Sequence, residues 1–177
     1  MNAVSNDPRQ VVQSALQYEA EGHKILIDAR DEATSPLSRA TFGFLADQEL
    51  KHIEAIKSYA ASLENTGDFD PDALAELSLE HAEHEIRGIF AQFREQFEEA
   101  ATLETREDVY QVAEDMERRG YNFYSAAAEQ LTGDSAKKLY AWLAGEETKH
   151  FTIIQETLEY IHQPDAIDAL EERWMQF

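Results

Sequence analysis

LADQELKH at residues 45–52 and LAGEETKH at residues 143–150 are two copies of one pattern, Leu-Ala-x-x-Glu-x-x-His. Each copy places a glutamate three residues before a histidine. On an α-helix, which turns by roughly 100° per residue, two such side chains lie on the same side, one shallow step apart along the axis. A carboxylate and an imidazole at this spacing can reach the same metal ion. One copy occurs by chance on many helices, but two copies in register favour a metal site.

The two copies belong to a longer internal repeat. Glu19 precedes Glu49 by the same interval that separates Glu117 from Glu147, since 49 − 19 and 147 − 117 both equal 30. A shift of 98 residues superimposes the two segments without a gap, since 117 − 19 and 147 − 49 both equal 98. Internal duplication is the simplest explanation, and it predicts two similar helix hairpins.

Composition and boundary signals predict an all-α protein. The chain has only 7 Gly and 4 Pro in 177 residues, too few for the many turns of an all-β protein. Asp7-Pro8 and Ser35-Pro36 each place a capping side chain before a proline suited to the first helical turn. Gly133 is expected to follow the end of one helix, with Asp134 as the N-cap of the next. The predicted helices span 8–33, 36–63, 106–132 and 134–163.

Short loops join the first two and the last two predicted helices, so each pair is expected to form an antiparallel hairpin. The long connection at 64–105 contains a helical stretch near Ala73–Ala100, and a four-helix bundle with one long crossover is a known arrangement. Residues 1–163 are therefore predicted to form one bundle domain. Residues 164–177 are expected to form a short docking helix. One side of that helix carries Ile167, Leu170 and Trp174.

The formal charge of the chain is −21, from 36 acidic and 15 basic residues. Such a field repels nucleic acid and anionic membranes, so neither is expected as a partner. The chain has no cysteine, which excludes disulfides, thiolate zinc sites and iron–sulfur clusters. The N-terminus lacks an apolar signal segment, and no run of about 18 apolar residues occurs, so a cytoplasmic location is expected.

Four glutamates interrupt the apolar stripes of the predicted bundle helices. Glu19 has Ala15 and Leu26 as neighbours at helical spacing, and Glu49 has Leu45. An unpaired ionised carboxylate in a core costs several kcal/mol, so four together require cations. Two divalent ions balance four carboxylates, and oxygen-rich coordination with one imidazole per ion suits iron or manganese rather than zinc. The predicted metal ligands are Glu19, Glu49, His52, Glu117, Glu147 and His150.

These segments resemble the rubrerythrin-type di-iron domain of the ferritin-like superfamily. The family pattern Ala-Leu/Ile-x-x-Glu-x-x-Gly, followed by Leu-Ala-x-x-Glu-x-x-His, is present at Ala15–Gly22 and Leu45–His52. It recurs at Ala113–Gly120 and Leu143–His150, with Glu114 in place of the aliphatic residue. The resemblance implies a ferritin-like four-helix bundle built from two duplicated antiparallel hairpins with a long helical crossover.

The resemblance also implies a role for each ligand. Glu49 and Glu147 are expected to bridge two metal ions, and Glu19 and Glu117 to bind one ion each terminally. His52 and His150 are expected to complete one ion each. The implied cofactor is a pair of iron ions, with manganese or a mixed iron/manganese pair as alternatives.

The function implied is that of a non-haem di-iron or iron/manganese oxidoreductase that reacts with peroxide or dioxygen, acting as a homodimer. Rubrerythrins proper carry a cysteine-ligated rubredoxin module, so this chain is expected to need a separate electron-donor protein. They also carry a mobile glutamate three residues after the first glutamate of the third helix. Counted from Glu117, that position is Gly120; counted from Glu114, it is Glu117. The alternative function is that of a ferroxidase or iron-handling protein without sustained turnover.

Several other residues have two possible roles. Glu114 is either an additional acceptor at the metal site or a partly exposed helix residue. His23 and Tyr121, which are equivalent in the repeat, either hydrogen-bond to ligand carboxylates or serve only in packing. His81 and His84 in the crossover form either a weak cation site or a solvated helix face. Electron transfer and aromatic packing are the two alternatives for Tyr18, Tyr124 and Tyr140.

Overall fold

The part of the chain that the structure describes forms helices and no strands. The structure is a computed structural model in which residues 4–64, 71–78, 86–90 and 107–163 are described. The all-α prediction is confirmed for these residues. The four long helices of the structure are α1 (Pro8–Glu32), α2 (Pro36–Glu64), α6 (Glu107–Gln130) and α7 (Asp134–His162).

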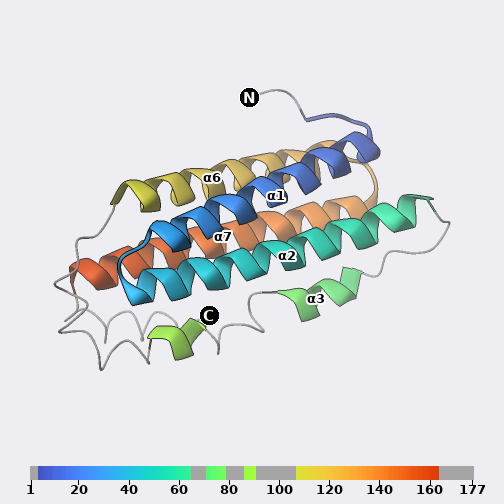
Figure 1. The fold of residues 1–177 in the computed structure, drawn as a ribbon. Coiled ribbons are helices and arrows are strands. Elements are labelled where there is room, and N and C mark those ends of the chain that lie inside the picture. Colours follow the sequence, from blue (N-terminus) through green and yellow to red (C-terminus); the bar gives the residue numbers. More distant parts are fainter. Residues whose placement is uncertain (1–3, 65–70, 79–85, 91–106, 164–177) are drawn as a thin grey trace.

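The four long helices lie side by side as a bundle (Figure 1). α1 packs along α2 and α6 packs along α7, with short connections at 33–35 and 131–133. α2 also contacts α7, and α1 contacts α6. The predicted helix bounds differ from the observed ones by at most two residues.

The first two helices begin where the sequence predicts. Asp7 is the N-cap of α1, and its carboxylate accepts a hydrogen bond from the backbone N–H of Arg9 at 3.0 Å. Pro8 occupies the first helical position, where a backbone N–H has no partner in any case. α2 begins after Ser35, whose hydroxyl accepts from the backbone N–H of Ser38 at 3.5 Å. Side-chain caps therefore satisfy backbone donors at both helix starts.

The boundary between α6 and α7 differs from the prediction. α6 ends at Gln130, and Gly133 itself is the N-cap of α7, with a φ of −80°. Asp134 is already the first residue of α7, so its predicted role as the N-cap is wrong. Gly133 also lacks the left-handed backbone that a glycine supplies directly after a helix. The connection is extended, and no backbone strain requires the glycine.

The apolar core is divided into two clusters that lie on either side of a polar layer. In α1, Val11 and Ala15 belong to the first apolar cluster, and Leu26 and Ala29 belong to the second. Glu19 lies between the two groups along the helix. In α2, α6 and α7 too, residues of one apolar cluster come before the predicted ligands and residues of the other cluster come after them. Every predicted ligand therefore lies between two layers of packed apolar side chains.

The connection between α2 and α6 is described in part. The short helices η1 (Pro71–Ala73) and α3 (Leu74–Leu77) contact α7 and α2, respectively. Residues 86–90 are helical, and Ile86 is buried in the second apolar cluster. α3 ends at Leu77 and Ser78 adopts a bend, so the helical stretch predicted near Ala73–Ala100 is interrupted there.

Two further predictions concern residues outside the described part of the chain. These are the docking helix at 164–177 and the crossover histidines His81 and His84. Within the described residues, no helix combines the length and the apolar character needed to cross a membrane.

Replacing Asp7 with Ala removes the side-chain cap of α1 and is expected to lower the free energy of unfolding by about 1 kcal/mol. Urea unfolding followed by circular dichroism measures the change. Asn6→Ala, at the adjacent exposed position, serves as the control and should have little effect. Equal unfolding midpoints for the Asp7 variant and the unmodified protein would contradict the capping role.

Candidate metal centre

All six predicted ligands converge at one level of the bundle. Each of the four long helices contributes at least one: Glu19 from α1, Glu117 from α6, a glutamate and histidine pair from α2, and a second pair from α7. None of these side chains is more than 1% exposed. The two pairs are Glu49 with His52 and Glu147 with His150.

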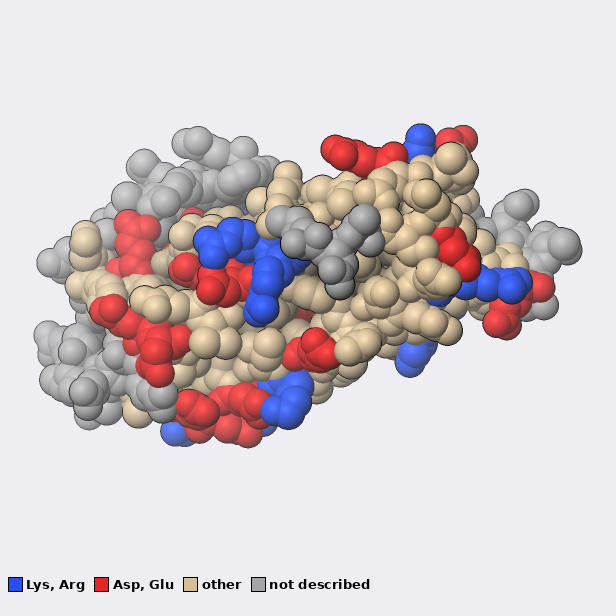
Figure 2. Space-filling model, turned by 90° about the horizontal axis from the view of Figure 1, so that it is seen from above, with Lys and Arg blue, Asp and Glu red and all other residues tan. Residues whose placement is uncertain are grey.

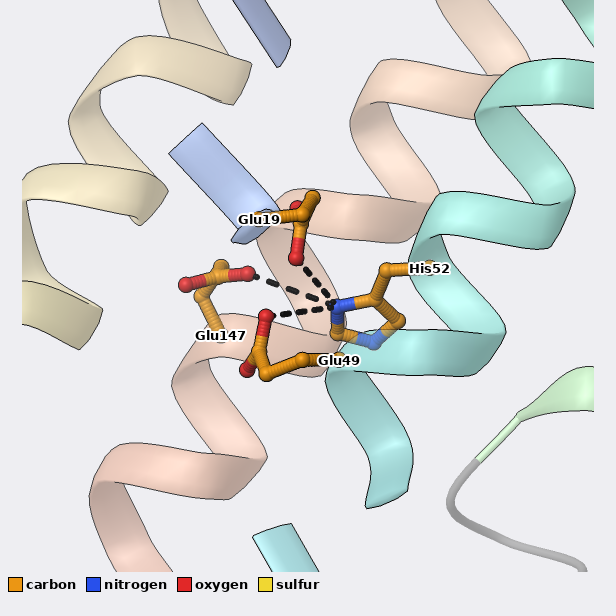
Figure 3. A group of neighbouring side chains, drawn as sticks. All are labelled: Glu19, Glu49, His52 and Glu147. Carbon is orange, nitrogen blue, oxygen red and sulfur yellow. Dashed lines mark hydrogen bonds and ion pairs between the residues drawn. The ribbon is translucent and has the colours of Figure 1, made fainter. Parts of the chain in front are cut away.

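The first group of potential ligands surrounds the imidazole of His52. Its Nδ1 lies 3.2 Å from Glu19 Oε2, 3.6 Å from Glu49 Oε2 and 3.7 Å from Glu147 Oε1. Figure 3 shows the three carboxylates, from three different helices, turned toward this nitrogen. The four residues offer ligand atoms that all lie within 4.8 Å of one another, which is close enough to hold one metal ion.

The second group surrounds the imidazole of His150. Its Nδ1 lies 3.0 Å from Glu49 Oε1 and 3.5 Å from Glu117 Oε2. Glu49 belongs to both groups, and its two oxygens face different imidazoles. The rings of His52 and His150 are stacked, with centroids 5.1 Å apart. Two adjacent cation positions that share one carboxylate fit this arrangement.

Most polar atoms of the cluster have no hydrogen-bond partner within the described residues. They include both oxygens of Glu117, both oxygens of Glu147, Glu49 Oε1 and His150 Nδ1, all inaccessible to solvent. Buried polar atoms in folded proteins are nearly always paired, because a carboxylate that loses its water without gaining a partner costs free energy. These buried, unpaired atoms belong to groups that could hold a metal ion.

Glu146 provides a comparison within the same helix. It precedes Glu147 and is equally buried, at 1% exposed. Its carboxylate accepts hydrogen bonds from Lys149 Nζ at 3.0 Å and from the hydroxyl of Ser78 at 2.9 Å. Glu146 thus has a lysine as its cation, whereas among the described residues the ion pairs of the cluster carboxylates involve histidines.

Burial and mutual repulsion change the proton affinities of the cluster. Burial and the neighbouring Glu49 raise the pKa of Glu19 to about 8. Burial, followed by Glu117, raises the pKa of Glu147 well above its usual range. Burial alone would lower the pKa of His150, but Glu117 and Glu49 raise it to about 9. Without metal, the cluster therefore retains protons at neutral pH that a bound cation would displace.

Glu49 has the opposite shift. Burial alone would raise its pKa, but contacts with Glu19, His150 and His52 hold the pKa of Glu49 well below its usual range. Glu49 is also the carboxylate shared by both groups of potential ligands, a position that suits a bridging role.

Two glycines leave room for the carboxylates of the opposite helix. A Cβ added at Gly22 would lie 3.5 Å from Glu49 Oε2 and 3.2 Å from the Met116 sulfur, an approach that small shifts can relieve. A Cβ added at Gly120 would lie 2.8 Å from Glu147 Cδ and 2.9 Å from Tyr18 Cε1. Any side chain at Gly120 would therefore have to displace the Glu147 carboxylate or the Tyr18 ring.

The residues with two possible roles lie largely outside the cluster. Glu114 is half-buried on α6 and belongs to neither group of potential ligands, and burial raises its pKa. His23 is half-buried and also belongs to neither group. Tyr121 is 46% exposed and lies at the surface rather than in the core. The first glutamate of α6 in the cluster is Glu117, so Gly120 is the residue three positions later.

Two contacts of the cluster were not anticipated from the sequence. The hydroxyl of Tyr124 donates a hydrogen bond to Glu19 Oε1, and the indole of Trp142 lies edge-on to His52, with ring centroids 5.5 Å apart. Tyr124 follows Glu117 by two helical turns, and the repeat places Leu26 at its equivalent position. The tyrosine at this position was the sequence feature that could have predicted the contact, because a tyrosine in an apolar core needs an acceptor for its hydroxyl.

The donor set is suited to a metal ion. Four carboxylates and two imidazoles supply oxygen and nitrogen donors of the kind that iron and manganese accept, and no thiolate exists in the chain. The buried groups could hold metal, although the geometry does not select its type. Comparison of the chain with protein-family models, with curated proteins and with solved structures found no match. Functional inference therefore depends on the site itself.

Replacing Gly120 with Ala is expected to displace the Glu147 carboxylate and to weaken metal binding by about tenfold or more. Titration with manganese(II), followed by calorimetry, measures the affinity and the number of ions bound. Gly22→Ala should have a smaller effect, because its nearest contacts are looser.

Gly145→Ala is the matched control for this substitution, since a Cβ at Gly145 meets nothing within 4 Å. It lies on α7 close to the same ligands and should leave the affinity unchanged. If Gly120→Ala and Gly145→Ala lowered the manganese affinity equally, crowding of the Glu147 carboxylate would not be the cause.

The metal-free protein is expected to lose stability as the pH rises from about 5 to about 9. In that window folded Glu19 and His150 keep protons up to about pH 8 and 9, whereas in the unfolded chain they lose them near 4.5 and 6.5. The folded state binds more protons, so the free energy of unfolding falls with pH. Bound metal replaces those protons, so the stabilisation by metal should grow over the same range.

Thermal unfolding at several pH values, with chelator or with manganese(II), tests this expectation. Glu19→Gln removes one of the titrating groups and should flatten the pH dependence of the metal-free protein. A metal-free protein that gains stability between pH 6 and pH 9 would disprove the account.

Proposed function

We propose that this chain is a rubrerythrin-like di-metal protein of ferritin-like architecture, and that it acts as an oxidoreductase on peroxide or dioxygen. Glu19, Glu49, His52, Glu117, Glu147 and His150 would hold two iron ions, or manganese in one or both positions. An iron pair bound there would supply two electrons to the oxidant, and a separate donor protein would return them. A homodimer is the proposed assembly.

The observation that carries the proposal is the shared carboxylate of Glu49. Its oxygens face the Nδ1 atoms of His52 and His150, at 3.6 and 3.0 Å, from within two adjacent groups of potential ligands. A single ion in the first group would leave Glu117 and His150 without a metal. Two metal ions held in the two groups would supply paired Lewis-acid and redox chemistry to an oxygen–oxygen bond.

The protein side chains have definable tasks in this proposal. The ionised Glu49 supplies a fixed negative charge between the two cation positions. Tyr124 donates to Glu19 and thereby holds that carboxylate in one orientation. The apolar clusters above and below the polar layer exclude water, which strengthens every charge interaction within it.

A second candidate function is iron handling, in which iron(II) is oxidised and passed on or stored. The charge of −21 and the lack of cysteine for a built-in electron-transfer module favour it. On the face seen in Figure 2, acidic side chains form several separate groups with lysine and arginine between them. Such a surface attracts cations in general, and the acidic groups on this face do not gather into one patch.

Rapid mixing separates the two functions. After anaerobic loading, we expect about two iron(II) ions per chain, and oxidation of the loaded protein by peroxide or dioxygen within a stopped-flow experiment. Repeated cycles with a chemical reductant, in a dimer, would support the oxidoreductase. A hollow multimer that retains iron after one oxidation would support iron handling, and well under one ion per chain would refute both.

Glu117→Ala tests the ligand assignment. The variant should lose about one of the two ions, because Glu117 belongs to only one of the two groups. The structure should tolerate the change better than an ordinary core truncation, since a buried carboxylate is removed together with its volume. Glu114→Ala, one turn earlier on α6, is the control and should keep full stoichiometry. Full stoichiometry in the Glu117 variant would show that it is not a ligand.

A further inference from the structure

A surface pocket between α6 and α7 reaches the buried cluster. Its volume is about 300 Å³. Two of its lining residues, Glu117 and Glu147, are cluster carboxylates that are at most 1% exposed, and a third, Tyr121, is 46% exposed. The pocket therefore approaches one side of the polar layer, and the carboxylate oxygens of both glutamates lie behind its wall, closed to solvent. The remaining lining residues are Arg118, Thr148 and Phe151.

The carboxylates that line this pocket are also those with free acceptor atoms. Both oxygens of Glu117 and both oxygens of Glu147 lack a hydrogen-bond partner within the described residues. Glu19, by contrast, accepts a hydrogen bond from Tyr124 and lies 3.2 Å from the Nδ1 of His52. Glu117 Oε2 in turn lies 3.5 Å from His150 Nδ1. Among the described residues, the difference between the two sides is therefore the tyrosine hydroxyl that Glu19 receives and Glu117 does not.

The sequence repeat shows that the two sides have diverged. Leu26 occupies the position equivalent to Tyr124, so Glu117 has no counterpart of the tyrosine that donates to Glu19. Thr148 follows Glu147 as Leu50 follows Glu49. The ligand residues are the same in both halves, while the residues around them are not.

We propose that peroxide or dioxygen reaches the metal pair through this pocket, and that its binding position lies on the Glu117 and Glu147 side of the cluster. The inference rests on the proposed di-metal function. A pocket of this volume admits molecules of a few atoms, and its Glu117 and Glu147 walls bring them to the metal positions. The Tyr124 side of the cluster then serves to hold its ligands, and the two metal positions are not equivalent.

Thr148→Trp, which places a large side chain in the pocket, tests the proposal, and Leu50→Trp is its matched control. Leu50 is 45% exposed and is the equivalent residue of the other half. Each variant is loaded with iron and oxidised, and the binding of sodium azide, a small anion, is titrated by absorbance. Thr148→Trp should weaken azide binding and slow oxidation by peroxide by about tenfold or more. Leu50→Trp should change neither.

Metal analysis of the same samples distinguishes the possible failures. If the unmodified protein holds no iron pair, both the proposed function and the pocket assignment fail. If it holds the pair but azide binds equally to all three proteins, or both tryptophan variants weaken it alike, only the pocket assignment is overturned. If Thr148→Trp does not fold or does not hold metal, Tyr121→Ala tests the assignment instead. This variant widens the pocket, so azide should bind faster. An unchanged rate in that variant overturns the assignment.

Discussion

The structure depends on the burial of four carboxylates and two imidazoles in one layer of a helical bundle. Apolar clusters close this layer from both ends, and none of its six side chains is more than 1% exposed. Removing charged groups from water costs several kcal/mol each unless opposite charges and hydrogen bonds replace the lost hydration. Glu146 meets this requirement through Lys149 and Ser78, whereas the adjacent Glu147 has no hydrogen-bond partner among the described residues. The cluster is therefore stable either as a proton-retaining network or as a metal site.

Close approach between helices makes the shared layer possible. Glu49 from α2 reaches toward Gly22 on α1, and Glu147 from α7 reaches toward Gly120 on α6, so each carboxylate uses space that a side chain would fill. The contact at Gly120 is the tighter of the two, so a side chain there would displace the Glu147 carboxylate.

Much of the bundle and the cluster could be predicted from the sequence, because the signals are local. The Glu-x-x-His spacing and the apolar neighbours of Glu19 follow from helical periodicity, and Asp7 forms its cap within two residues. The hydrogen bond from Tyr124 to Glu19 spans 105 positions in the chain, so it depends on how α6 packs on α1. The role of Gly133 was misjudged for a related reason, since the path of the connection decides which residue caps α7.

Sequence differences between the two equivalent halves can make the two sides of the cluster unequal. Tyr124 donates to Glu19, whereas Glu117 has no hydrogen-bond donor of this kind among the described residues. The pocket between α6 and α7 lies on the Glu117 side. Both properties arise from residues next to the ligands, not from the ligands themselves. The two halves share their donor residues and differ next to them, where Tyr124 stands opposite Leu26 and Thr148 opposite Leu50.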